Sequence, residues 1–124
     1  METTKDNKET TMVRIPTHAP PPHAGEILRE EFLEPHGMSQ AKLAEMIAVT
    51  VNRVNEIIKG KRGISPDTAI RLEALFGASA QFWLNLQLAW DLYHAQNEPE
   101  VQQVRKRIRR VPVNARFDRV RTTA

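Results

Sequence analysis

The chain has 124 residues and a mass of 14.2 kDa, and 40% of its residues are hydrophobic, which suits one small core and excludes a large enzyme. It contains no cysteine, which excludes disulfide bonds and thiolate metal sites. No run of about 18 apolar residues occurs, and the first residues lack an apolar signal region. We therefore expect a cytoplasmic protein with no membrane partner.

The net charge of +3 is unevenly distributed along the chain. Residues 23–97 contain seven Lys or Arg against nine Asp or Glu, whereas residues 98–124 contain eight against three. The pI of about 9.6 therefore reflects the C-terminal segment. A prediction of nucleic-acid binding has to rest on local clusters of charge, because the total says little about the domain itself.

The N-terminal part predicts an arm followed by a helix. Residues 1–22 are polar and then rich in proline, a composition that cannot bury a core, so we expect a flexible arm. A first helix is predicted from about Ala24 to Pro35, and Pro35 and Gly37 end it. Its inward positions are Ile27, Leu28, Phe32 and Leu33, and its outward positions are Glu30, Glu31 and Glu34.

Residues 38–63 predict two short helices joined by a tight turn. Ser39 is a good N-cap for a helix that begins at Gln40. Thr50 caps a second helix, from Val51 to about Lys59, and a glycine follows it. The core-facing positions of the two helices are Leu43, Ala44, Ile47, Val54, Ile57 and Ile58. This is the outline of a helix-turn-helix that docks on DNA, with the second helix free to enter a groove.

The outer side of that second helix carries residue types that read base edges. An amide pairs bidentately with adenine, a guanidinium with guanine, and a carboxylate accepts from cytosine; Asn52, Arg53 and Glu56 supply these three types. Phosphate contacts are expected from the helix starts and the basic loop. The full predicted DNA-binding set is Gln40, Thr50, Val51, Asn52, Arg53, Asn55, Glu56, Lys59, Lys61 and Arg62. The alternative is an ordinary pair of amphipathic helices with a solvated polar face.

Two further helices are predicted before residue 98. Ser65 and Pro66 begin one that ends at Gly77, and Ser79 caps the next, from Ala80 to about residue 96. The core positions of the earlier helix are Ala69, Leu72, Leu75 and Phe76. The later helix has one apolar stripe of Phe82, Leu86, Trp90 and Tyr93, with Trp83 beside it, and a second stripe of Leu84, Leu88 and Leu92.

One domain core needs only one of these stripes. The second, leucine stripe therefore predicts the interface of a homodimer, which is also how DNA-reading helices of this type usually work. The alternative is that the C-terminal segment folds back over the leucines within one chain.

Residues 98–112 predict a short amphipathic helix that Pro112 ends, with Val101, Val104, Ile108 and Val111 on one face. Its polar face carries Arg105, Lys106, Arg107, Arg109 and Arg110. Such a face suits phosphates, an acidic partner or an anionic membrane surface, and it is equally typical of a solvated helix. Residues 113–124 predict a disordered basic tail.

The polar residues give no catalytic pattern. The four histidines do not have metal-ligand spacing with any carboxylate, and Ser39, Ser65 and Ser79 are better explained as helix caps. No glycine-rich phosphate loop is present. We expect no enzymatic activity, no metal and no cofactor.

Three strings within about His23 to Pro112 resemble one family nearly end to end: HAGEILREEFLEPHGMSQAKLAEMI, VNRVNEIIKGKRGISPDTAIRLEALFG and SAQFWLNLQLAWDL. They resemble the Cro-and-repressor type of helix-turn-helix, and more narrowly the HigA family of addiction-module antitoxins. The resemblance implies an all-α, lambda-repressor-like DNA-binding domain of five or six helices over residues 23–97. There are two departures: Ala24 stands where the family usually has proline, and Ala48 stands at a turn position commonly occupied by glycine. Alanine tolerates the positive φ of such a turn poorly.

Antitoxins of this family bind and neutralise a small messenger-RNA-cleaving toxin and repress the promoter of their own operon. The resemblance therefore implies a HigB-like toxin, an inverted-repeat operator in double-stranded DNA, and a second copy of the chain as partners. The main alternative is a stand-alone transcriptional regulator of the same fold without a toxin. A more distant one is a protein-interaction adaptor whose helix-turn-helix no longer reads DNA.

Overall fold

The computed structural model describes residues 19–113, and every regular element among them is helical. The elements in chain order are α1 (Ala24–Ile27), η3 (Leu28–Leu33), α2 (Gln40–Ile47), α3 (Val51–Ile58), α4 (Pro66–Phe76), α5 (Ala80–Gln96) and α6 (Pro99–Arg107). Because α1 runs directly into η3, they form one first helix, and the chain has six helices over the described range. The all-α prediction is confirmed. Most of the predicted arm and tail lies outside the described residues.

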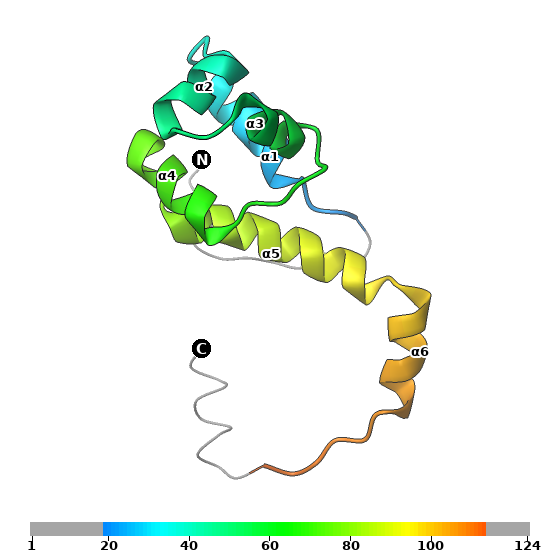
Figure 1. The fold of residues 1–124 in the computed structure, drawn as a ribbon. Coiled ribbons are helices and arrows are strands. Elements are labelled where there is room, and N and C mark those ends of the chain that lie inside the picture. Colours follow the sequence, from blue (N-terminus) through cyan, green and yellow to red (C-terminus); the bar gives the residue numbers. More distant parts are fainter. Residues whose placement is uncertain (1–18, 114–124) are drawn as a thin grey trace, which may run out of the picture.

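Helices α1 to α4 gather over the first part of α5, and α6 continues beyond the other end of α5 (Figure 1). The core lies among α1 to α4 and is closed by Trp83 of α5. Its largest fully buried side chains are Trp83, Leu28, Leu43, Ile57, Leu72 and Val54. Burying one such side chain contributes about 1.5–3 kcal/mol relative to leaving it exposed, so these residues fix how α3 and α4 sit on the rest of the domain.

Hydroxyl caps begin four of the helices, as predicted. The Ser39 hydroxyl accepts a hydrogen bond from the Lys42 amide at 3.0 Å, and the Thr50 hydroxyl accepts one from the Arg53 amide at 3.1 Å. Ser65 and Ser79 cap α4 and α5 in the same way. Each cap stabilises its helix by about 1 kcal/mol, because it satisfies an amide that has no partner inside the helix.

The first helix differs from the prediction in its winding. Its second half, η3, is a π-helix, and the Glu34 amide donates to the Arg29 carbonyl at 2.9 Å, five residues back. The wider turn of a π-helix brings residues five apart to the same side, so Leu28 and Leu33 are both buried. The helix ends at Leu33 rather than at Pro35.

Glycine at position 25 allows the first helix to approach α3 closely. A Cβ atom at Gly25 would lie 1.8 Å from the carbonyl oxygen of Ile57, which is far inside contact distance. The neighbouring Ala24 is fully buried. The backbone of α1 therefore packs directly against the backbone of α3, so the position of α3 depends on this contact.

The prediction that the last helix continues to Pro112 is wrong. Helix α6 ends at Arg107, and Ile108 is already in extended backbone, with φ −78° and ψ 129°. No residue of α6 is buried, so no packing energy supports another turn. Proline at 112 also disfavours a helical conformation for the residue before it. Arg109 and Arg110 therefore follow the helix and are not part of its polar face.

The leucine stripe of α5 is not covered within the chain. Leu88 is 49% exposed and Leu92 is 37% exposed, while Leu84 is half-buried and packs against the core of its own chain. The alternative in which the C-terminal segment folds back over these leucines is not formed by residues 98–113, because α6 leads away from them (Figure 1). None of the helices in residues 19–113 is both long and apolar enough to cross a bilayer.

Candidate nucleic-acid interface

The turn between α2 and α3 depends on one residue in a strained conformation. Ala48 has φ 60° and ψ 47°, and its amide donates to the carbonyls of Ala44 and Glu45. It is the only non-glycine residue with positive φ in the described part of the chain. The left-handed conformation costs an L-residue about 1–2 kcal/mol. Alanine therefore takes up the left-handed turn despite this cost.

The first turn of α3 presents its side chains to solvent. Val51 is 52% exposed and Asn52 is exposed. The Asn52 amide makes a single long hydrogen bond, 3.4 Å to Glu56 Oε2. The first residues of a recognition helix usually meet the base edges, and an apolar side chain such as Val51 suits the methyl group of thymine. Within the first turn of α3, these two side chains are therefore available to contact a ligand.

The other two predicted base readers already have partners within the protein. Arg53 Nη1 lies 3.1 Å from Asp67 Oδ2 and 3.5 Å from the Thr68 hydroxyl. Glu56 Oε1 accepts hydrogen bonds from Arg62, at 2.9 Å from Nε and 2.8 Å from Nη2. The guanidinium and the carboxylate are thus held beside the helix rather than extended from it.

The remaining predicted residues lie on α2, in the middle of α3 and in the loop that follows it. Asn55 donates to Gln40 Oε1 at 3.1 Å, which ties the first turn of α2 to the middle of α3. In the loop after α3, the amide of Lys61 donates to the Glu56 carbonyl at 2.8 Å, so the loop is folded against the end of the helix. The side chains of Lys59 and Lys61 are exposed, with no ion pair among the described residues.

Helix α5 fixes the other end of this loop. The side-chain carbonyl of Gln87 accepts a hydrogen bond from the amide of Ile64 at 2.7 Å. A Cβ atom at Gly63 would lie 2.7 Å from the same side chain, so glycine gives the loop room to approach α5. Local sequence spacing does not predict the role of Gln87, because its partner is 23 residues away.

Arg71 and Asp67 on α4 are the other residues that the sequence analysis missed. Arg71 Nη1 donates to the carbonyl of Ile47 at 2.8 Å and to that of Ala48 at 3.2 Å, and Arg71 Nε donates to Asp67 Oδ2 at 3.1 Å. Hydrogen bonds from Arg71 and then from Arg53 hold the pKa of Asp67 below its ordinary value. The spacing of Asp67 and Arg71 is visible in the sequence, but the contact with the turn is tertiary.

His23 has a structural place at the start of the first helix. Its Nδ1 accepts a hydrogen bond from the Gly25 amide at 2.9 Å, and its ring packs edge-on against Trp90 at 4.9 Å between centroids. Burial lowers the pKa of His23 below its ordinary value of 6.5, against the raising effects of Asp91 and Glu26. Within residues 19–113 no three His, Asp or Glu side chains are grouped as a metal site would require.

Comparisons with known proteins support a helix-turn-helix fold. A helix-turn-helix family model matches residues 29–83. Virulence-associated protein I of Dichelobacter nodosus is 50% identical over 78 residues, which are 63% of this chain and 72% of that protein. Antitoxin HigA-1 of Vibrio cholerae is 43% identical over 77 residues, which are 62% of this chain and 72% of that protein.

A solved structure, described as the Pseudomonas aeruginosa antitoxin HigA with the higBA promoter, is similar in fold as well as in sequence. It superposes with a TM-score of 0.69 at 43% identity, and the match covers 74% of this chain and 99% of that one. The similarity to HigA antitoxins extends well beyond the two helices of the motif. The chain belongs to the HigA family of helix-turn-helix antitoxins.

Proposed function

We propose that this protein binds the operator of its own operon through α3, represses transcription from it, and neutralises a HigB-like toxin in the cytoplasm. The observation that carries the DNA-binding part is the exposed first turn of α3, with Val51 and Asn52 free, on a helix-turn-helix whose position is fixed from several sides. The antitoxin part is inferred from the family.

Asn52 is the main base reader in this proposal. Its amide is exposed and has only one long hydrogen bond to give up, so it can pair bidentately with an adenine. Val51 adds an apolar contact beside it. Arg53 and Glu56 would have to break short contacts with Asp67 and Arg62 before they could reach a base. We therefore assign them a secondary role at the edge of the contact.

Phosphate contacts are proposed for both sides of α3. Lys59 and Lys61 project from the loop where the chain would pass the DNA backbone, and Arg62 lies next to them against Glu56. On the other side, Thr50 and Gln40 stand at the starts of α3 and α2, where unpaired amides favour an anion. Asn55 contributes by tying Gln40 to α3.

We propose a homodimer in which the exposed Leu88 and Leu92 of one chain pack against those of a second chain. Exposed leucines at a spacing of four on one helix favour a self-complementary twofold contact. Two recognition helices related by a twofold axis would meet the half-sites of an inverted repeat, about one DNA turn apart.

Two measurements in cells separate the parts of this proposal. A reporter driven by the operon's own promoter should be repressed by the intact protein and derepressed by Asn52→Ala. If a small toxin gene lies next to this one, expressing the toxin alone should arrest cell growth, and co-expressing this protein should restore it. A pull-down should then recover both proteins together. Repression without rescue would identify a stand-alone regulator, and rescue without repression would remove the operator-binding part.

A further inference from the structure

One arginine of helix α4 bonds to the backbone at the end of α2. The Arg71 guanidinium donates to the carbonyls of Ile47 and Ala48, which are the last residue of α2 and the first residue of the turn. Carbonyls at the end of a helix have no partner inside it, and no backbone amide bonds to either of these two in the described residues. Arg71 supplies the missing donors.

The same guanidinium is connected to α3 through one carboxylate oxygen. Asp67 Oδ2 accepts from Arg71 Nε and from Arg53 Nη1, each at 3.1 Å. Arg53 follows directly after the exposed Asn52 on α3 and is itself partly buried. The three residues Arg71, Asp67 and Arg53, called the α4 clamp below, thus join the turn before α3 to the face of α3 that would meet DNA.

The turn needs such a support because alanine occupies its left-handed position. At φ 60° the backbone of Ala48 is strained in a way that glycine would not be. An external donor to the Ala48 carbonyl opposes relaxation of the turn out of this conformation. The two features therefore belong together: a strained residue, and a side chain from another helix that holds its carbonyl.

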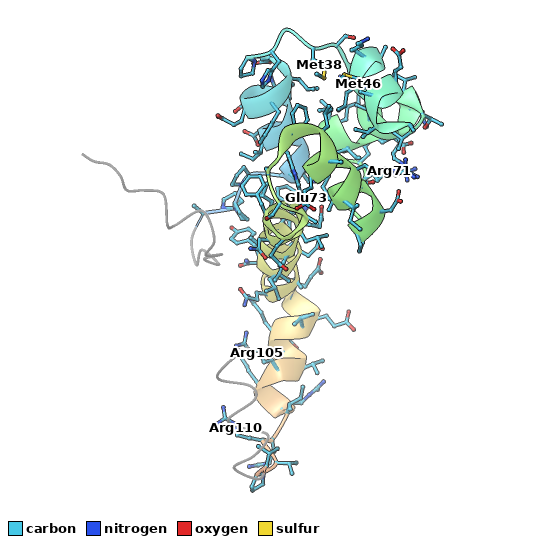
Figure 2. All side chains as sticks on the ribbon, turned by 90° about the vertical axis from the view of Figure 1, so that its left-hand side faces the viewer. Met38, Met46, Arg71, Glu73, Arg105 and Arg110 are labelled. Atoms are coloured by element: carbon cyan, nitrogen blue, oxygen red, sulfur yellow. The ribbon has the colours of Figure 1, made fainter. Side chains whose placement is uncertain are left out.

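The α4 clamp stands apart from the core. The Arg71 side chain is 38% exposed and that of Asp67 is 56% exposed, whereas α4 is anchored by the buried Ala69 and Leu72. Figure 2 shows Arg71 on the outer part of α4, and Arg71 and Met46 both line a shallow hollow between α4 and α2. Removing the clamp should leave the fold intact and loosen only the turn and α3.

We propose that Arg71 and Asp67 are positioning residues for operator recognition: they hold the strained turn and Arg53, so that Val51 and Asn52 meet the bases in register. This inference rests on the proposed operator binding. Base reading needs placement to within a fraction of an ångström, whereas contacts with phosphates tolerate more freedom. Loss of the clamp therefore lowers affinity for the operator more than affinity for unrelated DNA.

The test compares the affinity of the full chain for its operator with its affinity for a scrambled duplex of the same length. Both are measured at the same salt concentration. Arg71→Ala should weaken operator binding about 10-fold, or 1.4 kcal/mol, and scrambled binding less than about 3-fold. Arg71→Lys keeps the charge but lacks the planar set of donors, so it should lose about 3-fold on the operator. Arg29→Ala removes an arginine paired with Glu30 and Glu34 on the first helix and should change neither affinity.

Glycine at the turn provides a rescue that a merely structural role would not predict. Added to Arg71→Ala, the substitution Ala48→Gly should restore at least half of the lost operator preference, because a turn with glycine is relaxed and no longer needs the Arg71 donor. Ala48→Gly alone should leave the operator preference as it is in the wild-type protein. Thermal unfolding of each variant checks that the fold survives; if Arg71→Ala does not fold, Arg71→Lys and its combination with Ala48→Gly give the same comparison.

Two results would overturn the inference while the proposed function stands. One is an unchanged operator preference in the folded Arg71 variants. The other is a fall of about 1 in the slope of log affinity against log salt, which would make Arg71 a phosphate contact instead. If the wild-type protein itself shows no preference for its operator, the proposed function fails, independently of the clamp.

Discussion

Asn52 and its neighbour Arg53 differ in how much it costs them to reach DNA. The Asn52 amide is exposed and has one hydrogen bond at 3.4 Å, whereas the Arg53 guanidinium is held by Asp67 at 3.1 Å. A side chain that is already bonded must lose that bond before it gains another, so its net contribution to binding is reduced. The free amide is therefore expected to determine sequence preference more than the guanidinium.

We predict that Asn52→Ala weakens binding to the operator by about 1–3 kcal/mol and changes binding to unrelated DNA little, because a base contact is lost and no phosphate contact. Fluorescence anisotropy with both duplexes at one salt concentration measures this. Gln103→Ala on the exposed face of α6 is the matched amide control and should behave as wild type. An equal loss on both duplexes would mean that Asn52 does not read a base.

His23 makes the stability of the domain depend on pH. Its Nδ1 accepts the capping hydrogen bond from Gly25 only when it is unprotonated, and burial lowers the pKa of His23 in the folded state. The folded protein therefore binds this proton less readily than the unfolded chain does. The stabilisation is fully present above the ordinary pKa of 6.5 and is lost as the pH falls through the lower folded-state pKa.

We expect the melting temperature to fall as the pH is lowered through and below 6.5, and part of this fall to disappear in His23→Asn, since asparagine is a good N-cap that does not titrate. His36→Asn is the control, because His36 is exposed and its Nδ1 contacts only the Phe32 carbonyl. Melting curves of wild type and both variants decide the matter. A pH dependence in His23→Asn identical to that of wild type would contradict this account.

The sequence predicts the helix N-caps better than it predicts the side-chain contacts between helices. Ser39 and Thr50 bond to amides three residues ahead, so their role follows from local rules of spacing. The contacts of Arg53 with Asp67 and of Arg71 with Ile47 join residues 14 and 24 positions apart. Such pairs exist only after α4 has packed on α2 and α3, and a single sequence contains no sign of which charges will meet.

At the scale of elements, the loop after α3 provides the sequence-independent part of binding. Lys59 and Lys61 are exposed and lie beyond the end of α3, where the chain would pass the DNA backbone. When a lysine that contacts a phosphate is replaced by a neutral residue, fewer counterions are released on binding. These lysines should therefore affect the operator and unrelated DNA alike.

We predict that Lys59→Gln and Lys61→Gln each lower the slope of log affinity against log salt by about 1, measured on operator and scrambled duplexes. Arg29→Gln on the first helix is the control for a lost positive charge, and its slope should equal that of wild type. Unchanged slopes for both lysine variants would remove this loop from the interface.

The elements that departed from expectation did so for two physical reasons. The first helix follows a predicted range closely, but its π winding depends on Leu28 and Leu33 both finding the core, which is a property of packing. Helix α6 departs from the prediction because packing is absent. Its apolar spacing is helical, yet none of its residues is buried, so periodicity alone overestimated its length.

At the scale of the whole molecule, charge and exposed apolar surface lie apart from the proposed DNA-binding turn. Arg105 and Arg110 lie at the opposite end of the molecule from Met46 of α2 (Figure 2). Between these ends, α5 carries the exposed Leu88 and Leu92. A second copy packed on these leucines would bring a second recognition helix into the assembly.

We predict that Leu88→Asp produces a folded monomer that binds the operator weakly, because the contact would otherwise bury an unpaired charge. Sedimentation shows the oligomeric state, and circular dichroism shows whether the helices remain. Ile70→Asp on α4 is the matched control, since Ile70 is 59% exposed and lies outside the leucine stripe; it should remain dimeric. A folded Leu88→Asp protein that stays dimeric would place the interface elsewhere.

Sequence-specific binding of the operator can be measured directly on the purified protein. The affinity of the purified full-length protein is determined by anisotropy for a duplex from its own promoter and for a scrambled duplex, both at physiological salt. A specific repressor should bind its operator at least about 1,000-fold more tightly than the scrambled sequence. Equal affinities for the two duplexes would contradict the account.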